Sequence, residues 1–484
     1  MGQYRNNLNR RQVLQLLAGS GAALYLTPGE SAFAQDAAPS KKFLLYIHAG
    51  SWDGWAAGLL QPLDVNRFPS GVFVPGQPGA PTNPNLGVHT KVGDLVFHEY
   101  SKVLGGIANH LCLGMGNSES AGHDSARLIR GTGSSREGVT GTPGWPFALA
   151  QATMGNKAVD FVCGMDNFHR GSQTTAQVLG FGASNPATVR TIFSDVAGIS
   201  QKRGAAEWAE LTANLFGTGV GPTVFSESEV NAGSQGLKQL AKGLPNVDAL
   251  IASLNTTFTL PRANALLQTA GLIDFDGTIA DNFVDRAGTL EKLKTAALLI
   301  ETKIASGMQI SLPNQDFHGG GSEVITARSG ANLWSYLTLF WNWVKLRNLQ
   351  DDVMVIVSHE FSRTAYNATI PATGINVKIR QNNALVDLAV RAPGKDHQLA
   401  FGMYFLNGKV PSQSRLGGIG DYYTPAPTKG LNGELDATAP AYTAQQMVCS
   451  MLLRVWPEIF KDQRYIRQFY PTFAEKDVIA SLLA

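Results

Sequence analysis

The chain has 484 residues, of which 44% are hydrophobic, and its 39 Lys and Arg against 37 Asp and Glu give a formal net charge of +2. This length is enough to bury a large core. So small a net charge excludes the strong electrostatic attraction expected of a nucleic-acid-binding protein or of one that binds an acidic membrane surface. The three cysteines (Cys112, Cys163 and Cys449) form no CxxC pair, so neither a thiolate zinc site nor a disulfide scaffold is indicated.

The first 34 residues have the pattern of an export signal. Arg10 and Arg11 precede a short apolar stretch at 13–26, which is too short to span a bilayer, and Ala32 and Ala34 offer an A-x-A cleavage point. Paired arginines before such a stretch resemble a twin-arginine signal, and an ordinary secretory signal is the alternative. Both predict a periplasmic or secreted bacterial protein whose mature domain is 35–484. The first also predicts the twin-arginine translocase as a partner during export. No transmembrane anchor is expected.

Beyond the signal, apolar runs bounded by glycine or charge alternate with helical patterns. Strands are expected at 41–50, 158–165 and 401–410, at 308–320 where the strand ends in a polar loop, and at 351–364 where it runs into a polar turn. The apolar run "HLCL" before Ser118 is a further possible strand. A Pro/Gly-rich surface loop is expected at 68–85, and helices are expected at 331–349 and through a helical insertion at about 197–300. Buried apolar strands that alternate with helices are typical of a parallel sheet covered on both faces. The sequence therefore predicts an α/β protein, a three-layer sandwich with a mostly parallel central sheet.

Polar residues follow several of these strands. They are Asp53, Ser118, Asp316, His318, His359 and Glu360, and His397 precedes the last strand. In a parallel sheet these clusters share one edge, where ligands bind. Carboxylates and imidazoles together suit one or two divalent ions such as zinc, manganese or calcium. Each residue alone also has a structural interpretation as a turn residue, a loop hydrogen bond, a buried histidine or an ion pair.

Three arginines and one further histidine lie near these clusters. Arg127, Arg130 and Arg363 are candidate anion clamps, because a guanidinium matches phosphate or sulfate in a bidentate way, and surface salt bridges are the alternative. His123 lies five residues after Ser118 and is a candidate catalytic residue. The remaining histidines fit no such pattern and are expected to be structural (His48, His89, His98, His110 and His169).

Several of these segments resemble one family. "MGNSESAGH" (115–123) is similar to the nucleophile motif M-G-N-S-E-V-G-H of cofactor-independent phosphoglycerate mutases, and "DGW" (53–55) resembles their first metal-ligand motif. "NQDFHGG", "VMVIVSHEF" and "GKDH" resemble their later metal-binding segments. Together the motifs resemble the core of the alkaline phosphatase-like superfamily. By its leader and by "QDFH", "EFSRT" and "KDH", the chain resembles most a family of twin-arginine-exported bacterial proteins within it.

The resemblance implies an exported metal-dependent hydrolase or transferase of phosphate or sulfate esters, with a small-molecule or glycan ester as substrate. Ser118 would be the nucleophile and would form a covalent ester, assisted by His123, Arg127 and Arg363. Metal ligands would come from Asp53, Asp316, His318, His359, Glu360 and His397.

The alternative is a catalytically degenerate member of the fold that acts as an exported binding or assembly protein. It rests on departures from the motifs. Asp316 and His318 are two residues apart rather than four, and His359–Glu360 reverses the usual Asp-His order.

Overall fold

The structure is a computed structural model. It describes residues 41–50, 58, 89–98, 101–118, 120, 122–134, 141–154, 160–166, 169, 171, 174, 178–191, 247–271, 286–312, 323–363, 375–381, 384–390, 397–398, 400–419, 425–431, 434, 436 and 439–483.

One large sheet organises the described residues. Its eight strands lie in the spatial order β14 (Ser414–Leu416), β4 (Leu111–Asn117), β13 (Ala400–Leu406), β8 (Val353–Ser358), β1 (Phe43–His48), β7 (Ala305–Ser311), β5 (Asp160–Gly164) and β6 (Val178–Gly182). Strand β13 is antiparallel to both of its neighbours, and all other neighbouring pairs are parallel. The predicted mostly parallel sheet is confirmed, and the last predicted strand, β13, runs against the others.

Four two-stranded ribbons accompany the sheet. They are β2 (His89–Val92) with β3 (Leu95–His98), β9 (Ser362–Arg363) with β12 (His397–Gln398), β10 (Ile375–Gln381) with β11 (Ala384–Val390), and β15 (Gly418–Ile419) with β16 (Pro425–Ala426).

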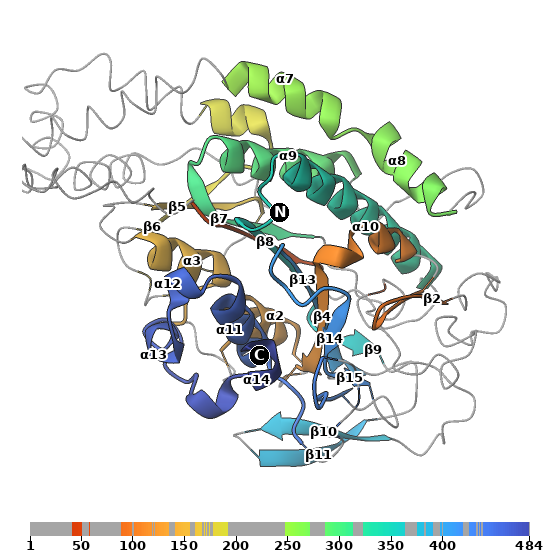
Figure 1. The fold of residues 1–484 in the computed structure, drawn as a ribbon, viewed down its shortest axis with the longest axis vertical. Coiled ribbons are helices and arrows are strands. Elements are labelled where there is room, and N and C mark those ends of the chain that lie inside the picture. Colours follow the sequence, from red (N-terminus) through yellow and green to blue (C-terminus); the bar gives the residue numbers. More distant parts are fainter. Residues whose placement is uncertain are drawn as a thin grey trace, which may run out of the picture.

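Helices cover both faces of the sheet (Figure 1). One face carries η1 (Lys102–His110), α7 (Val247–Thr257), α8 (Leu260–Thr269), α9 (Arg286–Glu301) and α10 (Glu323–Leu346). The other carries α2 (His123–Thr132), α3 (Trp145–Met154), α11 (Ala444–Val455), α12 (Pro457–Phe460), α13 (Gln463–Ile466) and α14 (Ala480–Leu483), with the short η4 (Glu475–Asp477) before α14. No helix in the described part of the chain is both long and apolar enough to cross a membrane.

The side chains of β1 show why its sequence is apolar throughout. Phe43, Leu45 and Ile47 belong to the core under α9 and α10, whereas Leu44 and Tyr46 belong to the core under α3 and α11. A strand buried on both faces needs apolar residues at every position, which gives a continuous run instead of an alternating pattern. Two cores separated by one sheet are the three layers that the sequence predicts.

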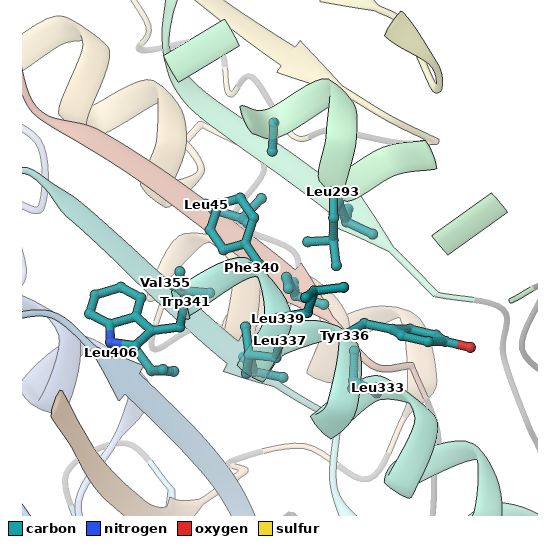
Figure 2. Packing of buried hydrophobic residues seen from close by; sticks show 14 of the residues in the cluster. Leu45, Leu293, Leu333, Tyr336, Leu337, Leu339, Phe340, Trp341, Val355 and Leu406 are labelled. Atoms are coloured by element: carbon teal, nitrogen blue, oxygen red, sulfur yellow. The ribbon is translucent and has the colours of Figure 1, made fainter. Parts of the chain in front are cut away.

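Helix α10 fills the first of these cores with aromatic side chains. Phe340 and Trp341 lie against the sheet beside Leu45, Val355 and Leu406, as Figure 2 shows. These side chains are at most 1% exposed. Burying an aromatic side chain of this size contributes on the order of 3 kcal/mol of transfer free energy.

The predicted helical segment at 197–300 is described only at 247–271 and from 286 onward, where it forms α7, α8 and α9. Helix α9 leads directly into β7, and its Leu293 and Leu298 lie in the same core as the sheet residues. Two elements begin earlier than expected, because β7 starts at Ala305 and α10 at Glu323.

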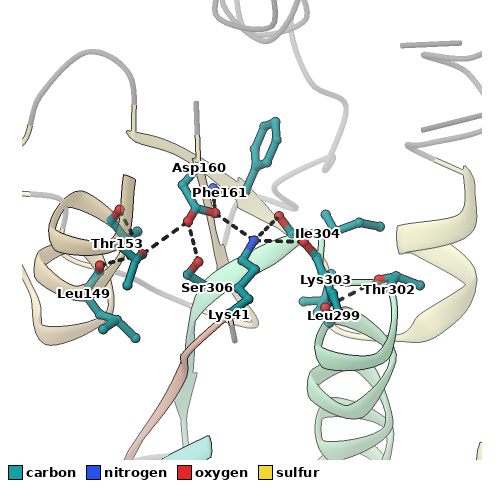
Figure 3. A network of polar contacts seen from close by, with 11 residues as sticks. Lys41, Leu149, Thr153, Asp160, Phe161, Leu299, Thr302, Lys303, Ile304 and Ser306 are labelled. Carbon is teal, nitrogen blue, oxygen red and sulfur yellow. Dashed lines mark hydrogen bonds and ion pairs between the residues drawn. The ribbon is translucent and has the colours of Figure 1, made fainter. Parts of the chain in front are cut away.

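A buried ion pair ties the amino edge of the sheet together (Figure 3). The Asp160 side chain is 2% exposed, and its Oδ1 accepts from Lys41 Nζ at 3.2 Å and from the Phe161 backbone N–H at 2.8 Å. Its Oδ2 accepts from the hydroxyl of Ser306, and Lys41 also donates to the Lys303 carbonyl at 2.8 Å. These contacts join the chain just before β1 to the start of β5 and β7.

We expect Asp160→Asn to lower the free energy of unfolding by about 3 kcal/mol, because an amide leaves the Lys41 ammonium without its counter-charge in a largely dry site. Urea denaturation followed by circular dichroism measures the loss. Glu434→Gln is the control: its ion pair with Lys429 is exposed, and such pairs contribute little. An unchanged unfolding midpoint for Asp160→Asn would contradict this structural role.

Candidate functional site

The strand directions bring several sequence-predicted positions to one edge of the sheet. His48 at the end of β1 pairs with Ser358 of β8 and with Ser311 of β7, so these three parallel strands end level with one another. Asn117 at the end of β4 pairs with Ala400 at the start of β13. Because β13 is antiparallel, its amino end, and not its carboxyl end, lies at this edge.

A buried carboxylate lies at the centre of this edge. Glu360 follows β8 and is fully buried. Its Oε2 lies 2.6 Å from His123 Nδ1, and its Oε1 accepts from Arg127 Nε at 3.2 Å and Nη2 at 3.0 Å. His48 Nε2 lies 3.5 Å from the same Oε1. Two residues of α2 and the last residue of β1 thus surround one carboxylate.

Glu360 is ionised throughout the physiological range. Burial alone would raise the pKa of this carboxyl, but the contacts with His48, His123 and Arg127 outweigh burial and lower the pKa to about 2. Burial lowers the pKa of His48, so its ring is neutral at pH 7. The guanidinium of Arg127 therefore gives Glu360 a counter-charge that does not depend on the protonation of a histidine.

Arg130 holds the backbone of Glu360 from the other side. Its side chain is fully buried, its guanidinium carbon lies 3.6 Å from the centre of the Phe401 ring, and its Nε donates to the Glu360 carbonyl at 3.3 Å. The Arg130 carbonyl in turn accepts from Trp145 Nε1 at 2.6 Å. Helix α2 ends at Gly133 with φ 65°, where a side chain would overlap the Trp145 ring. These contacts fix α2 relative to the sheet.

Ser118 lies in the turn between β4 and α2. It is fully buried, and its hydroxyl donates to the Ser120 carbonyl at 2.7 Å. The Ser120 hydroxyl accepts from the Gly122 backbone N–H at 3.1 Å, directly before His123 begins α2. The possible strand before the serine is present as β4, and the polar segment after it forms helix α2, which the sequence did not predict.

The glycines of "GMGN" have a structural reason. A side chain on Gly116 would overlap the Tyr442 carbonyl, and one on Gly114 would overlap the sulfur of Met447. Because neither glycine carries a side chain, the segment before α11 can approach β4. There the Asn117 backbone N–H donates to the Tyr442 carbonyl at 2.9 Å.

His359 is buried beneath this cluster. Burial lowers its pKa to about 3, so the ring is neutral at pH 7. Its Nδ1 lies 3.3 Å from the Gly402 carbonyl and 3.4 Å from the Gly402 nitrogen. Within the described residues, neither His359 Nε2 nor His48 Nδ1 has a hydrogen-bond partner.

The predicted site residues fall into three groups. His123 and Arg127 both contact Glu360, and Ser118 and His359 lie at the same edge. For Arg363 and His397 the structure describes the backbone, which places them directly opposite each other in the ribbon of β9 and β12. The remaining predicted metal ligands lie outside the described residues (Asp53, Asp316 and His318).

The sequence did not point to one member of this cluster, His48, and it suggested a different role for another, Arg130. His48 was expected to be structural. Its position at the end of a predicted buried strand could have indicated that it lies at the site. Arg130 was considered as an anion clamp, but it is fully buried and holds the backbone of Glu360. Its position three residues after Arg127 puts both on one side of the helix.

The described residues alone do not make a metal site. Among them, no group of three or more His, Cys, Asp and Glu side chains is arranged to hold an ion. Neutral, buried imidazoles such as His48 and His359 could bind a metal, but the carboxylate of Glu360 already has Arg127 and His123 as partners. A metal centre therefore depends on Asp53, Asp316 and His318 and stays a prediction.

Comparisons with protein-family models and with curated proteins give no match. Among solved structures, the chain is similar to the lipoteichoic acid synthase LtaP from Listeria monocytogenes (8% identity, TM-score 0.30, covering 82% of this chain and 72% of that one). It is also similar to the lipooligosaccharide phosphoethanolamine transferase EptA from Neisseria meningitidis (8%, 0.26, covering 77% and 50%). A third is the phosphonate monoester hydrolase of Agrobacterium radiobacter (13%, 0.25, covering 78% and 70%). At such TM-scores these likenesses carry no argument, and the site is interpreted from its own residues.

The lowered pKa values of His359 and Glu360 predict that the protein loses stability in acid in two steps. The pKa of His359 in the folded protein, about 3, lies below its ordinary value of 6.5. As pH falls below 6.5 the unfolded chain therefore binds a proton that the folded protein does not, and the free energy of unfolding decreases. Glu360 causes a second decrease in the free energy of unfolding below about pH 4.5, because its carboxylate is protonated in the unfolded chain before it is protonated in the folded protein. We expect His359→Gln to flatten the first step, measured as the free energy of unfolding in urea between pH 7 and 5. Equal slopes for variant and wild type would contradict a neutral, buried His359.

Proposed function

We propose that the chain hydrolyses or transfers a phosphate or sulfate ester at this edge of the sheet, with Ser118 as the nucleophile. The observation that carries the proposal is the cluster on α2. Arg127 and His123 are 35% and 30% exposed, whereas the Glu360 carboxylate between them is fully buried. A guanidinium that is partly open to solvent and held in place by a buried carboxylate suits an anionic substrate, and the His123 ring lies beside it with its Nε2 buried.

Ser118 is close enough to this cluster to share a substrate. Strands β4 and β8 are separated by β13 alone, so their ends lie about 10 Å apart at ordinary strand spacing. In the proposed reaction, Oγ of Ser118 forms a bond to phosphorus or sulfur, the bond to the ester oxygen breaks, and the proton of Oγ passes to a base. Water, or an acceptor alcohol in a transferase, then releases the group from the serine.

The remaining parts of the proposal rest on the sequence. A divalent metal held with Asp53, Asp316 and His318, export through the twin-arginine translocase, a periplasmic or secreted location, and a small-molecule or glycan ester as substrate all stay predictions. Membership of the alkaline phosphatase-like superfamily, which the sequence motifs suggest, also stays a prediction. The three-layer architecture with a mostly parallel sheet agrees with what that resemblance implies.

A second candidate function is an exported binding or assembly protein without turnover. It is favoured by the protein partners that the Ser118 hydroxyl and the Glu360 carboxylate already have within the described residues. The Ser118 hydroxyl is buried and donates to a backbone carbonyl, and both oxygens of Glu360 are engaged by protein groups. Such a protein would bind an anion at α2 and leave its ester bond intact.

We expect Ser118→Ala to lower the turnover of 4-nitrophenyl phosphate, bis(4-nitrophenyl) phosphate or 4-nitrophenyl sulfate by about 1,000-fold or more, because no covalent ester can form. Ser120→Ala is a matched control: it keeps the backbone carbonyl that accepts from Ser118, and its turnover should stay within a few-fold of wild type. Wild-type turnover of any of these esters combined with an unaffected Ser118→Ala would exclude Ser118 as the nucleophile.

Metal content separates the two candidate functions. We expect the purified protein to contain zinc, manganese or calcium in a fixed ratio, measured by mass spectrometry of the elements, and Asp316→Ala to lose it together with turnover. Protein that is free of metal, stable and inactive on all three esters would support the binding protein instead.

A further inference from the structure

We infer that Glu360 is a positioning residue for His123 and is not a metal ligand: its carboxylate holds His123 as the Nδ1–H tautomer, so that Nε2 exchanges the proton at the ester site. This inference deepens the proposed function and rests on it. It replaces the metal-binding role that the sequence suggests for Glu360.

The contact geometry fixes the imidazole in one orientation. Glu360 Oε2 and His123 Nδ1 are 2.6 Å apart, and the Phe361 ring packs against the imidazole with 5.1 Å between ring centres. The carboxylate is held in turn, because Arg127 binds Oε1 through two nitrogens and Arg130 binds the Glu360 carbonyl. An imidazole with a buried hydrogen-bond partner and an aromatic neighbour has little freedom to rotate.

The tautomer follows from the charge of the carboxylate. An ionised carboxylate only accepts hydrogen bonds, so the hydrogen between Oε2 and Nδ1 belongs to the ring. The two hydrogen bonds from the Arg127 guanidinium to Oε1 favour this ionised form. In the neutral imidazole, Nε2 then carries the lone pair and is the nitrogen that can accept a proton.

The surroundings of the carboxylate disfavour a metal ion. A divalent ion binds a carboxylate oxygen at about 2.0–2.6 Å. Oε1 already lies 3.0 Å from the positive Nη2 of Arg127. Arg130, which is fully buried, adds a second positive charge nearby. A cation at Glu360 would have to displace Arg127 and approach two guanidinium groups.

In the proposed reaction, the Ser118 hydroxyl leaves the Ser120 carbonyl to which it donates in the structure, and its proton passes to His123 Nε2, directly or through one water, while the Oγ bond to phosphorus or sulfur forms. The resulting imidazolium is stabilised by the Glu360 carboxylate and returns the proton to the departing ester oxygen. When water later attacks the serine ester, Nε2 accepts a proton of that water, and Ser118 Oγ is reprotonated as it leaves. The proton count therefore closes over one turnover.

The tautomer is tested directly on the full-length wild-type protein. Two-dimensional NMR of the ring nitrogens, with His123→Gln to assign the signal, should show at pH 8 a protonated Nδ1 and an unprotonated Nε2. This measurement needs neither turnover nor a variant of Glu360. A protonated Nε2 with a bare Nδ1 would overturn the inference.

Enzyme kinetics and metal content test the role of Glu360. We expect Glu360→Gln to lower kcat on 4-nitrophenyl esters by about 100-fold, and the double variant with His123→Gln to be no slower than His123→Gln alone, because Glu360 acts through His123. The metal-to-protein ratio should equal that of wild type. Asp160→Asn is the matched control for loss of a buried, ion-paired carboxylate, and it should leave kcat and the His123 tautomer unchanged.

Loss of bound metal in Glu360→Gln, or losses in kcat that multiply in the double variant, would overturn the inference. The failure of the proposed function looks different. Wild-type protein inactive on every ester would refute turnover at this site, while the NMR signal of His123 would still decide whether Glu360 sets its tautomer.

Discussion

A carboxylate stays ionised inside a protein only when cations or hydrogen-bond donors surround it, and Glu360 is such a carboxylate. Its neighbours come from separate parts of the chain: Arg127, Arg130 and His123 lie on α2, and His48 ends β1. The dependence is mutual, because Glu360 gives Arg127 a carboxylate partner and gives the fully buried Arg130 a carbonyl acceptor. The docking of α2 on the sheet and the charge at the end of β8 therefore stabilise each other.

This constraint also determines where the serine lies. Helix α2 follows β4 after a five-residue turn, so a helix held at the carboxyl edge carries Ser118 to that edge. Gly114 and Gly116 let the segment before α11 lie against β4 and support the turn from below. The glycines that give "GMGNS" its resemblance to a nucleophile motif thus have packing roles. Whether Ser118 reacts depends on the groups that face it.

Much of the fold could be predicted from the sequence, because buried strands of a parallel sheet are continuous apolar runs. Those runs carry no information on direction, so the antiparallel course of β13 could not be foreseen. The site was predicted less well. His123 and Arg127 were candidates, but their partner Glu360 is more than 230 residues away in the chain, and no local pattern joins them. His48 was missed because a histidine that ends an apolar strand resembles an ordinary core residue.

The central claim is that this edge of the sheet cleaves an ester through Ser118, and trapping the covalent intermediate tests it most directly. The protein is mixed with a radiolabelled phosphate or sulfate ester, quenched in acid during turnover, digested and mapped by mass spectrometry. The account predicts label on the peptide that contains Ser118 and none in Ser118→Ala. Label on another residue, or turnover with no label on the protein at any quench time, would contradict it.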